Sequence, residues 1–205
     1  MSLHTKASSI IRITRMWFVG NIEEIDAIER DNRALVSTFV HHCYDEQMIM
    51  DVLGARRGFD RHVKSAWHLL VPCKLAHEKR VGYSVDSTPG SDQYCEDLAY
   101  KIAEGLDLPV ASLPCLIFRA GNGSYYFLKL GGKSREDVSL ILREIGDLAN
   151  ECHANGPANP EAYRQYVNTV VVNYLRKKKL LSALKSALPV LERLIGTAVN
   201  IKELV

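Results

Sequence analysis

The sequence predicts a mixed α/β fold: a central sheet flanked by helices, followed by a C-terminal helical extension. Three observations predict it. Short apolar runs alternate with helical patterns over the first part of the chain. Asn122-Gly123 then joins two further apolar runs as a β-hairpin. The stretch Asn155–Pro160 is dense in turn residues, and it divides the chain into a body, residues 1–154, and an extension, residues 155–205.

The first half of the body is predicted as β-α-β-α-β. Part of 10–19 is a strand, and Asn21 caps a helix that ends near residues 31–33. Residues 34–40 form a strand buried on both faces. Residues 44–66 form a helix that Gly54 and Gly58 kink or split, and a second buried strand lies within 67–75.

The second half is predicted as α-β-β-α. Residues 77–93 form a loop, and Ser91 or Asp92 caps the helix that follows. Strands at 116–118 and 125–130 form the hairpin, and Ser134 caps a helix with Asp137 three residues on. Beyond the boundary we expect helices over about 160–187 and 189–199, the second beginning at Pro189.

Composition excludes some functional classes and points to a compartment. Charge is balanced, with 26 basic and 24 acidic residues and a net charge of +2, which gives no case for nucleic acid or a membrane surface. The extension carries eight Lys/Arg and three Glu, or +5, so the body carries −3. We expect no transmembrane helix and no secretory leader. Five widely spaced cysteines then indicate reduced thiols in the cytoplasm.

Three segments resemble the thioredoxin superfamily in the right order. Residues 34–49 resemble the strand, first active-site cysteine and helix, with Cys43 at the cysteine. Residues 112–123 resemble the segment around the cis-proline, with Pro114 at that position, and residues 130–145 resemble the last strand end, glycine bend and final helix. The resemblance implies a thioredoxin-like domain over residues 1–154 and does not extend to the tail.

The departures from the family pattern bear on function. Where the family has Cys-Gly-Pro-Cys, this chain has Cys43-Tyr44-Asp45-Glu46, so Glu46 replaces the resolving cysteine. The buried acid of the family falls on Ser37, and the tryptophan before the first cysteine falls on His42. Dithiol exchange needs a second thiol to release the mixed disulfide, and none lies nearby in sequence.

Cys43 is the candidate nucleophile. The resemblance places it at a helix N-terminus, which stabilises a thiolate, while Asp45 and Glu46 oppose that effect. The alternative is an inert cysteine held by packing. The resemblance also implies that Leu113 presents its backbone for strand addition beside Pro114; the alternative is an ordinary trans proline. Cys115 is either a redox partner of Cys43 or a buried strand cysteine.

Other patterns carry weaker hypotheses. His41-His42-Cys43 and Cys73 with His77 hold metal-ligand residue types, but neither spacing matches a known closed site, and we expect no metal. The run Arg176–Lys179 is a solvated basic face or a site for RNA or anionic lipid. The apolar stripe on the same segment packs on the body or on a second copy of the chain.

The sequence therefore supports two function hypotheses. The first is a thioredoxin-like protein without dithiol redox activity that acts as a protein-interaction or chaperone-like module. It would use His42, Tyr44, Glu46, Leu113 and Pro114 to bind a protein partner or a second copy, with no cofactor. The alternative is a monothiol enzyme that uses Cys43, glutathione-linked or peroxide-reactive, with glutathione supplying the resolving sulfur.

Overall fold

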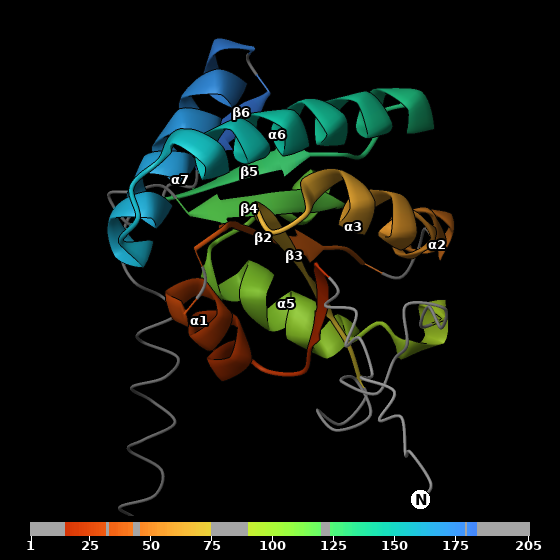
Figure 1. The fold of residues 1–205 in the computed structure, drawn as a ribbon. Helices are drawn as coiled ribbons and strands as arrows, with labels where there is room; N and C mark the ends of the chain where they lie inside the picture. Colours follow the sequence, from red (N-terminus) through yellow and green to blue (C-terminus); the bar gives the residue numbers. More distant parts are fainter. Residues whose placement is uncertain are drawn as a thin grey trace, which may run out of the picture.

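The computed structural model describes residues 15–31, 33–42, 46–74, 90–119, 124–178 and 180–183. The described strands form one mixed sheet of six strands in the order β1-β3-β2-β4-β5-β6 (Figure 1). The strands are β1 (Met16–Val19), β2 (Leu35–Val40), β3 (Trp67–Pro72), β4 (Cys115–Arg119), β5 (Tyr125–Lys129) and β6 (Leu181–Ala183).

The sheet is parallel on one side and antiparallel on the other. β1 and β2 both pair with β3 in parallel. β4 pairs antiparallel with β2, β5 with β4, and β6 with β5. β2 and β3 are buried along their whole length, which agrees with the continuous apolar runs that predict them.

Helices cover both faces of this sheet. In Figure 1, α1 (Ile22–Asp31) and α5 (Glu96–Gly105) lie below it. α3 (Arg56–Val63), α6 (Arg135–Asn155) and α7 (Pro160–Lys177) lie above it, and α2 (Glu46–Gly54) leads into α3. Two short 3₁₀ helices, η1 (Ser91–Gln93) and η2 (Val110–Ser112), flank α5 in the chain. The predicted mixed α/β fold is confirmed at this level.

Side-chain caps begin several helices. Asn21 Oδ1 accepts from the Glu24 amide at 2.8 Å, and Ser134 Oγ accepts from the Asp137 amide at 3.1 Å, as the sequence predicts. Asn159 Oδ1 accepts from the amides of Glu161 and Ala162, each at 3.0 Å, directly before the first residue of α7. Each cap satisfies amides that have no partner within the helix.

The predicted interruption of the helix over residues 44–66 is confirmed beside Gly54, because α2 ends at Gly54 and α3 begins at Arg56. Two other predicted boundaries are wrong. Ser91 and Asp92 do not cap α5; they lie in η1, and α5 begins at Glu96. The helix predicted over 160–187 ends at Lys177, and Leu181–Ala183 is a strand on β5. Pairing with an open sheet edge outweighs helix propensity there. The predictions for 10–14, 77–89 and 189–199 fall outside the described residues.

α7 packs on the sheet of its own chain. Tyr163, Val167, Val171 and Leu175 form its inner stripe, each with 0% of its surface exposed. They belong to the same hydrophobic core as the strands, and α7 contacts β2, β4 and β6. The apolar stripe that suggested self-association is therefore covered within the chain.

Candidate functional site

The predicted site residues come together at one end of the sheet, where β2 ends and β4 begins. Val40, the last residue of β2, lies opposite Cys115, the first residue of β4. His41 and His42 therefore follow β2 at the end of the sheet where Leu113 and Pro114 lead into β4. The Leu113–Pro114 peptide bond is cis, as the resemblance implies. We call this region the β2–β4 end.

The side chains at the β2–β4 end differ in exposure. His42 is half-buried, and its ring meets that of His41 edge-on with centroids 5.2 Å apart. Glu46 is exposed in the first turn of α2. Leu113 is buried. Cys43 and Tyr44, the candidate nucleophile and its neighbour, lie outside the described residues.

Tyr94 holds the chain as it leaves β2, a role that the sequence did not reveal. Its hydroxyl accepts from the amide of His41 at 2.8 Å and donates to the carbonyl of the same residue at 3.3 Å. The Tyr94 side chain thus bonds both the amide and the carbonyl of His41. Tyr94 is buried, and burial raises its pKa, so the hydroxyl stays protonated.

The amide of Leu113 already has a hydrogen-bond partner within the chain. Its amide donates to Val110 O at 3.0 Å, so strand addition through this amide requires that bond to break, in contrast to the expectation from sequence. Gly131 packs close by: a methyl group on its Cα would lie 3.3 Å from Leu113 O and 3.2 Å from Pro114 Cδ. Its amide and that of Leu130 donate to Pro114 O, at 3.3 and 2.8 Å. The glycine bend thus braces the cis-proline.

Burial keeps Cys115 from acting as an activated thiol at this end of the sheet. Cys115 has 0% exposure, and burial raises its pKa to about 12. Cys152 lies on α6, and burial raises its pKa as well. Cys73 is buried and Cys95 is half-buried. Because only a thiolate attacks a disulfide, Cys115 is a buried strand thiol at neutral pH rather than a ready partner for Cys43.

The Ser37 side chain accepts a hydrogen bond within the core. Its hydroxyl accepts from Trp67 Nε1 at 2.8 Å, and both side chains are buried. The position that carries an acid in the thioredoxin pattern therefore serves a hydrogen bond within the core. This bond satisfies an indole N–H that has no access to water.

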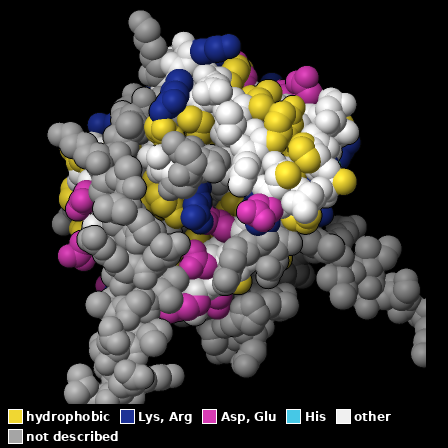
Figure 2. Space-filling view, turned by 90° about the vertical axis from the view of Figure 1, so that its left-hand side faces the viewer, with side chains coloured by type: hydrophobic (Ala, Val, Ile, Leu, Met, Phe, Trp, Pro, Cys, Tyr) yellow, Lys and Arg dark blue, Asp and Glu magenta, His cyan; other side chains and the backbone are white. Residues whose placement is uncertain are grey.

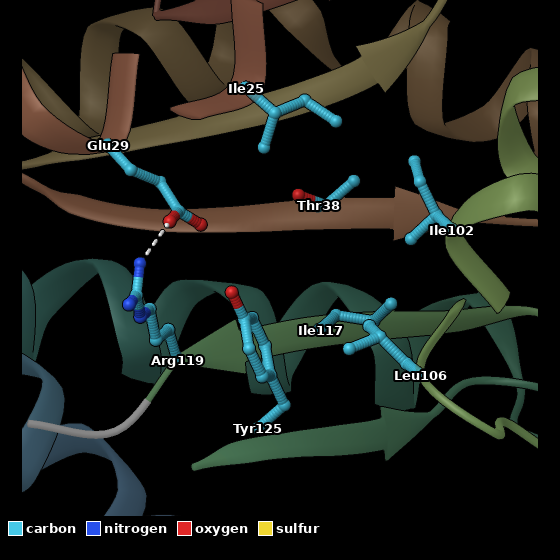
Figure 3. A pocket seen from close by; sticks show the side chains of 8 residues that line it. All are labelled: Ile25, Glu29, Thr38, Ile102, Leu106, Ile117, Arg119 and Tyr125. Carbon is cyan, nitrogen blue, oxygen red and sulfur yellow. Dashed lines mark hydrogen bonds and ion pairs between the residues drawn. The ribbon is translucent and has the colours of Figure 1, made fainter. Parts of the chain in front are cut away.

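A small pocket lies between β2, β4 and β5 and the two helices α1 and α5 that cover this face of the sheet (Figure 3). It encloses about 310 Å³ of space, open solvent included. Arg119 Nη1 contacts Glu29 Oε2 at 3.2 Å at its rim. Burial raises the pKa of Glu29, against the effect of Arg119. Burial lowers the pKa of Arg119, but Tyr125 and Glu29 outweigh it and the net shift is upward. The remaining walls are apolar or hydroxyl-bearing: Ile25, Thr38, Ile102, Leu106, Ile117 and Tyr125.

Charge is unevenly distributed over the surface. In Figure 2, acidic side chains lie mostly in the lower half, where α1 lies in Figure 1, and Lys and Arg mostly in the upper half, towards the end of α7. The basic run is partly tied down. Arg176 stacks on the Tyr126 ring, 4.4 Å from its centroid, and Lys178 Nζ contacts both oxygens of Glu144 at 2.8 Å. Glu144 therefore offsets the charge of Lys178, whereas Arg176 keeps its charge on the Tyr126 ring.

Metal-ligating residues do not cluster in the described ranges, since no three His, Cys, Asp or Glu side chains come together there. None of the helices in these ranges has the length and apolar character to cross a membrane.

The fold and the β2–β4 end define a mixed α/β protein with a buried cis-proline loop beside the exit of its central strand. No protein-family model matches the chain, and no curated protein or solved structure matches it significantly.

Proposed function

We propose that the chain is a thioredoxin-like protein that lacks dithiol exchange and binds other proteins through the β2–β4 end. Two observations support the family assignment. The parallel order β1-β3-β2 followed by the antiparallel pair β4-β5 agrees with the thioredoxin layout. The cis-proline of that layout has its counterpart in Pro114.

Two positions support the absence of dithiol exchange. Glu46 occupies the position of the resolving cysteine and is exposed to solvent. Cys115, which follows the cis-proline, is protonated at neutral pH because burial raises its pKa to about 12. Cys73 is buried and Cys115 is both buried and protonated, so neither supplies a resolving thiolate.

Exposed apolar side chains support a binding role. Val110 has 61% of its surface exposed and precedes the cis-proline loop in η2. Met50 is 47% exposed on α2, one turn after Glu46. Large apolar side chains in water favour contact with apolar segments of other proteins. Because the Leu113 amide is already bonded, the partner would be held by side chains more than by strand addition.

Two assays on the full chain test this proposal. The first is reduction of insulin disulfides by dithiothreitol: we expect the background rate for both the wild type and Cys43→Ser. The second is suppression of client-protein aggregation, followed by light scattering. We expect the wild type to suppress it and Val110→Asp and Met50→Asp to lose several-fold of that effect.

Tyr166→Asp is the matched control, because Tyr166 is also exposed, at 39%, but lies in α7 close to the α6–α7 turn, which Arg33 binds at the other end of β2. Equal loss in Tyr166→Asp would indicate general stickiness and contradict the proposal. Turnover that needs Cys43 and rises with glutathione would instead establish the monothiol enzyme.

A further inference from the structure

One histidine and one arginine hold the carboxyl end of α6 against the start of β2. His153 is half-buried in the last turn of α6, and Arg33 precedes β2 in the chain. Arg33 Nη1 lies 3.4 Å from His153 Nδ1 and donates to the His153 carbonyl at 3.2 Å. The same guanidinium donates to the carbonyls of Gly156 and Pro157. These contacts fix the α6–α7 turn, residues 156–159, to the sheet.

The neighbours of His153 determine which of its ring nitrogens carries the proton. A guanidinium can only donate, so the nitrogen that faces Arg33, Nδ1, is unprotonated. Nε2 then carries the hydrogen and donates to Ser65 Oγ, 3.2 Å away. The ring is therefore neutral in this arrangement. A second proton would have to go to Nδ1, where it would replace the hydrogen bond from Arg33 with a contact between two donors.

The charged groups around His153 oppose its protonation. The charged and titratable side chains that face it come from β3, α7 and the segments before β1 and β2: Arg15, Arg33, His68 and Tyr163. Burial has the largest effect and lowers the pKa of His153; the charges of Arg33 and Arg15 lower it further, and a backbone contact with Arg33 opposes them. Burial raises the pKa of Tyr163, so its hydroxyl is uncharged. A proton on His153 would therefore join two guanidinium charges.

Tyr163 makes the closed turn less favourable than its packing suggests. Its ring lies 4.4 Å below the Arg33 guanidinium and edge-on to His153, with 0% of its surface exposed. Its buried hydroxyl has no hydrogen-bond partner among the residues that the structure describes. A buried hydroxyl without a partner is unfavourable, whereas water would satisfy it if the turn opened. An open turn would thus relieve both this hydroxyl and a protonated His153.

We propose that His153 is an acid-operated release for the α6–α7 turn. At neutral pH its unprotonated Nδ1 accepts from Arg33, and the turn stays on the start of β2. When Nδ1 takes up a proton from solvent, this hydrogen bond is lost and the two positive charges repel each other. The turn then separates from β2 and exposes Tyr163.

The direction of the pH dependence follows from the two forms of the turn. In the open turn His153 is hydrated and away from Arg33, so its pKa returns towards 6.5. Below this value the open turn binds a proton that the closed turn does not. The ratio of open to closed turn therefore rises as the pH falls below 6.5, by at most about tenfold per pH unit.

Amide hydrogen exchange of the full chain, followed by mass spectrometry, tests the proposal. Each rate is compared with the intrinsic exchange rate at the same pH to give a protection factor. In the wild type we expect the protection factor of residues 154–163 to fall at least threefold from pH 7 to pH 5. In His153→Gln it should stay constant. The glutamine amide can accept from Arg33 and donate to Ser65, but it does not take up a proton.

His68→Gln is the matched control. His68 lies at the same end of the sheet and also changes charge in acid, but it bonds Trp17 rather than Arg33. The threefold fall at residues 154–163 should persist in this variant. Its absence there would mean that the turn opens only when the whole domain unfolds, which overturns the proposal. Constant protection in the wild type, or an equal fall in His153→Gln, would overturn it as well.

Nuclear magnetic resonance of the histidine rings gives a second test on the wild-type chain. At pH 7.5 we expect the ¹⁵N shifts of His153 to show hydrogen on Nε2 and none on Nδ1. On acidification Nδ1 should take up a proton with a midpoint below 6.5. His153→Gln assigns the signals by their loss. Hydrogen on Nδ1 at pH 7.5, or a midpoint of 6.5 or higher, would contradict the arrangement on which the proposal depends.

Discussion

The two ends of the central strand β2 are held by different chemistry. At its amino end, Arg33 donates from Nε to Pro157 O at 2.9 Å, from Nη1 to His153 O at 3.2 Å and from Nη2 to Gly156 O at 3.1 Å. Its guanidinium also stacks on the Tyr163 ring, 4.4 Å from the centroid. One cation therefore closes the carboxyl end of α6 and ties the α6–α7 turn to the sheet.

The carboxyl end of β2 is held by neutral groups. The Tyr94 hydroxyl bonds the backbone of His41, and the cis-proline loop is braced by backbone bonds from Leu130 and Gly131. We therefore expect changes in pH and salt concentration to weaken the contacts at the amino end of β2. The candidate site at the carboxyl end of β2 should keep its geometry over the same conditions. The predictions that follow test this contrast.

The largest expected effect is a loss of folding stability at acid pH, caused by protonation of His68 near the amino end of β2. Trp17 Nε1 donates to His68 Nδ1 at 2.9 Å, so the imidazole is neutral. Burial, with smaller effects from Arg15 and His153, lowers its pKa from 6.5 to about 4. Between these values the unfolded chain binds a proton that the folded chain does not, so stability falls as pH drops below 6.5. The expected loss is about 3 kcal/mol by pH 4.

Urea unfolding at intervals from pH 7.5 to 4 measures this dependence. His68→Gln should flatten this pH dependence. A curve for His68→Gln that parallels the wild type would show that another group dominates.

Removing the Arg33 guanidinium should have the next largest effect on folding stability. Arg33→Ala loses three hydrogen bonds to carbonyls and the stacking on Tyr163, and we expect the free energy of unfolding to fall by about 2.5 kcal/mol. Arg33→Lys should recover less than half, because an ammonium cannot span three acceptors. Urea unfolding at pH 7 gives both values. Full recovery in Arg33→Lys would mean that charge alone matters there.

Tyr94→Phe should have a smaller effect on stability and a local effect on structure. The amide of His41 loses its acceptor in a buried site, at a cost of about 1.5 kcal/mol. Hydrogen exchange should show faster exchange at His41. Tyr100→Phe is the control, since Tyr100 is 47% exposed on α5. Unchanged exchange at His41 would mean that the hydroxyl does not hold the end of β2.

The smallest expected effect is the reaction of Cys115 with an alkylating reagent in the folded protein. Because burial raises its pKa to about 12, iodoacetamide should leave it unlabelled in the folded protein from pH 7 to 9. Unfolding in urea should make it react fully. Peptide mass spectrometry separates its labelling from that of Cys43. Rapid labelling of Cys115 in the folded protein would place a reactive thiol at the candidate site.

Local patterns predicted the parts of the fold that depend on local physics. Apolar runs indicated β2 and β3, and the caps at Asn21 and Ser134 lie where their side chains favour them. Arg33 shows where this fails. Its three acceptors lie more than a hundred residues away in sequence, so no local signal marks it. β6 shows a different limit, because its residues look helical until the open edge of β5 is present.

The sequence predicted the position of the cis-proline at the candidate site, but it did not predict the side chain that holds the end of β2. The resemblance indicated the cis-proline at Pro114 and its closeness to the end of β2. No local signal marks the role of Tyr94, because a single tyrosine in an apolar pattern has the same signature as an ordinary core residue. Only the fold brings its hydroxyl to His41, across more than fifty residues of sequence.

The closing of the β5 edge by β6 has a consequence for synthesis on the ribosome. β5 ends at Lys129, but its edge partner ends at Ala183, roughly 50 residues later. At translation rates of 5 to 20 residues per second, the nascent chain carries an open strand edge for roughly three to ten seconds. During most of that time Tyr126 also lacks the cover of Arg176 from α7. The growing chain is therefore most exposed to aggregation just before its extension emerges, and factors that bind nascent chains would act within that interval.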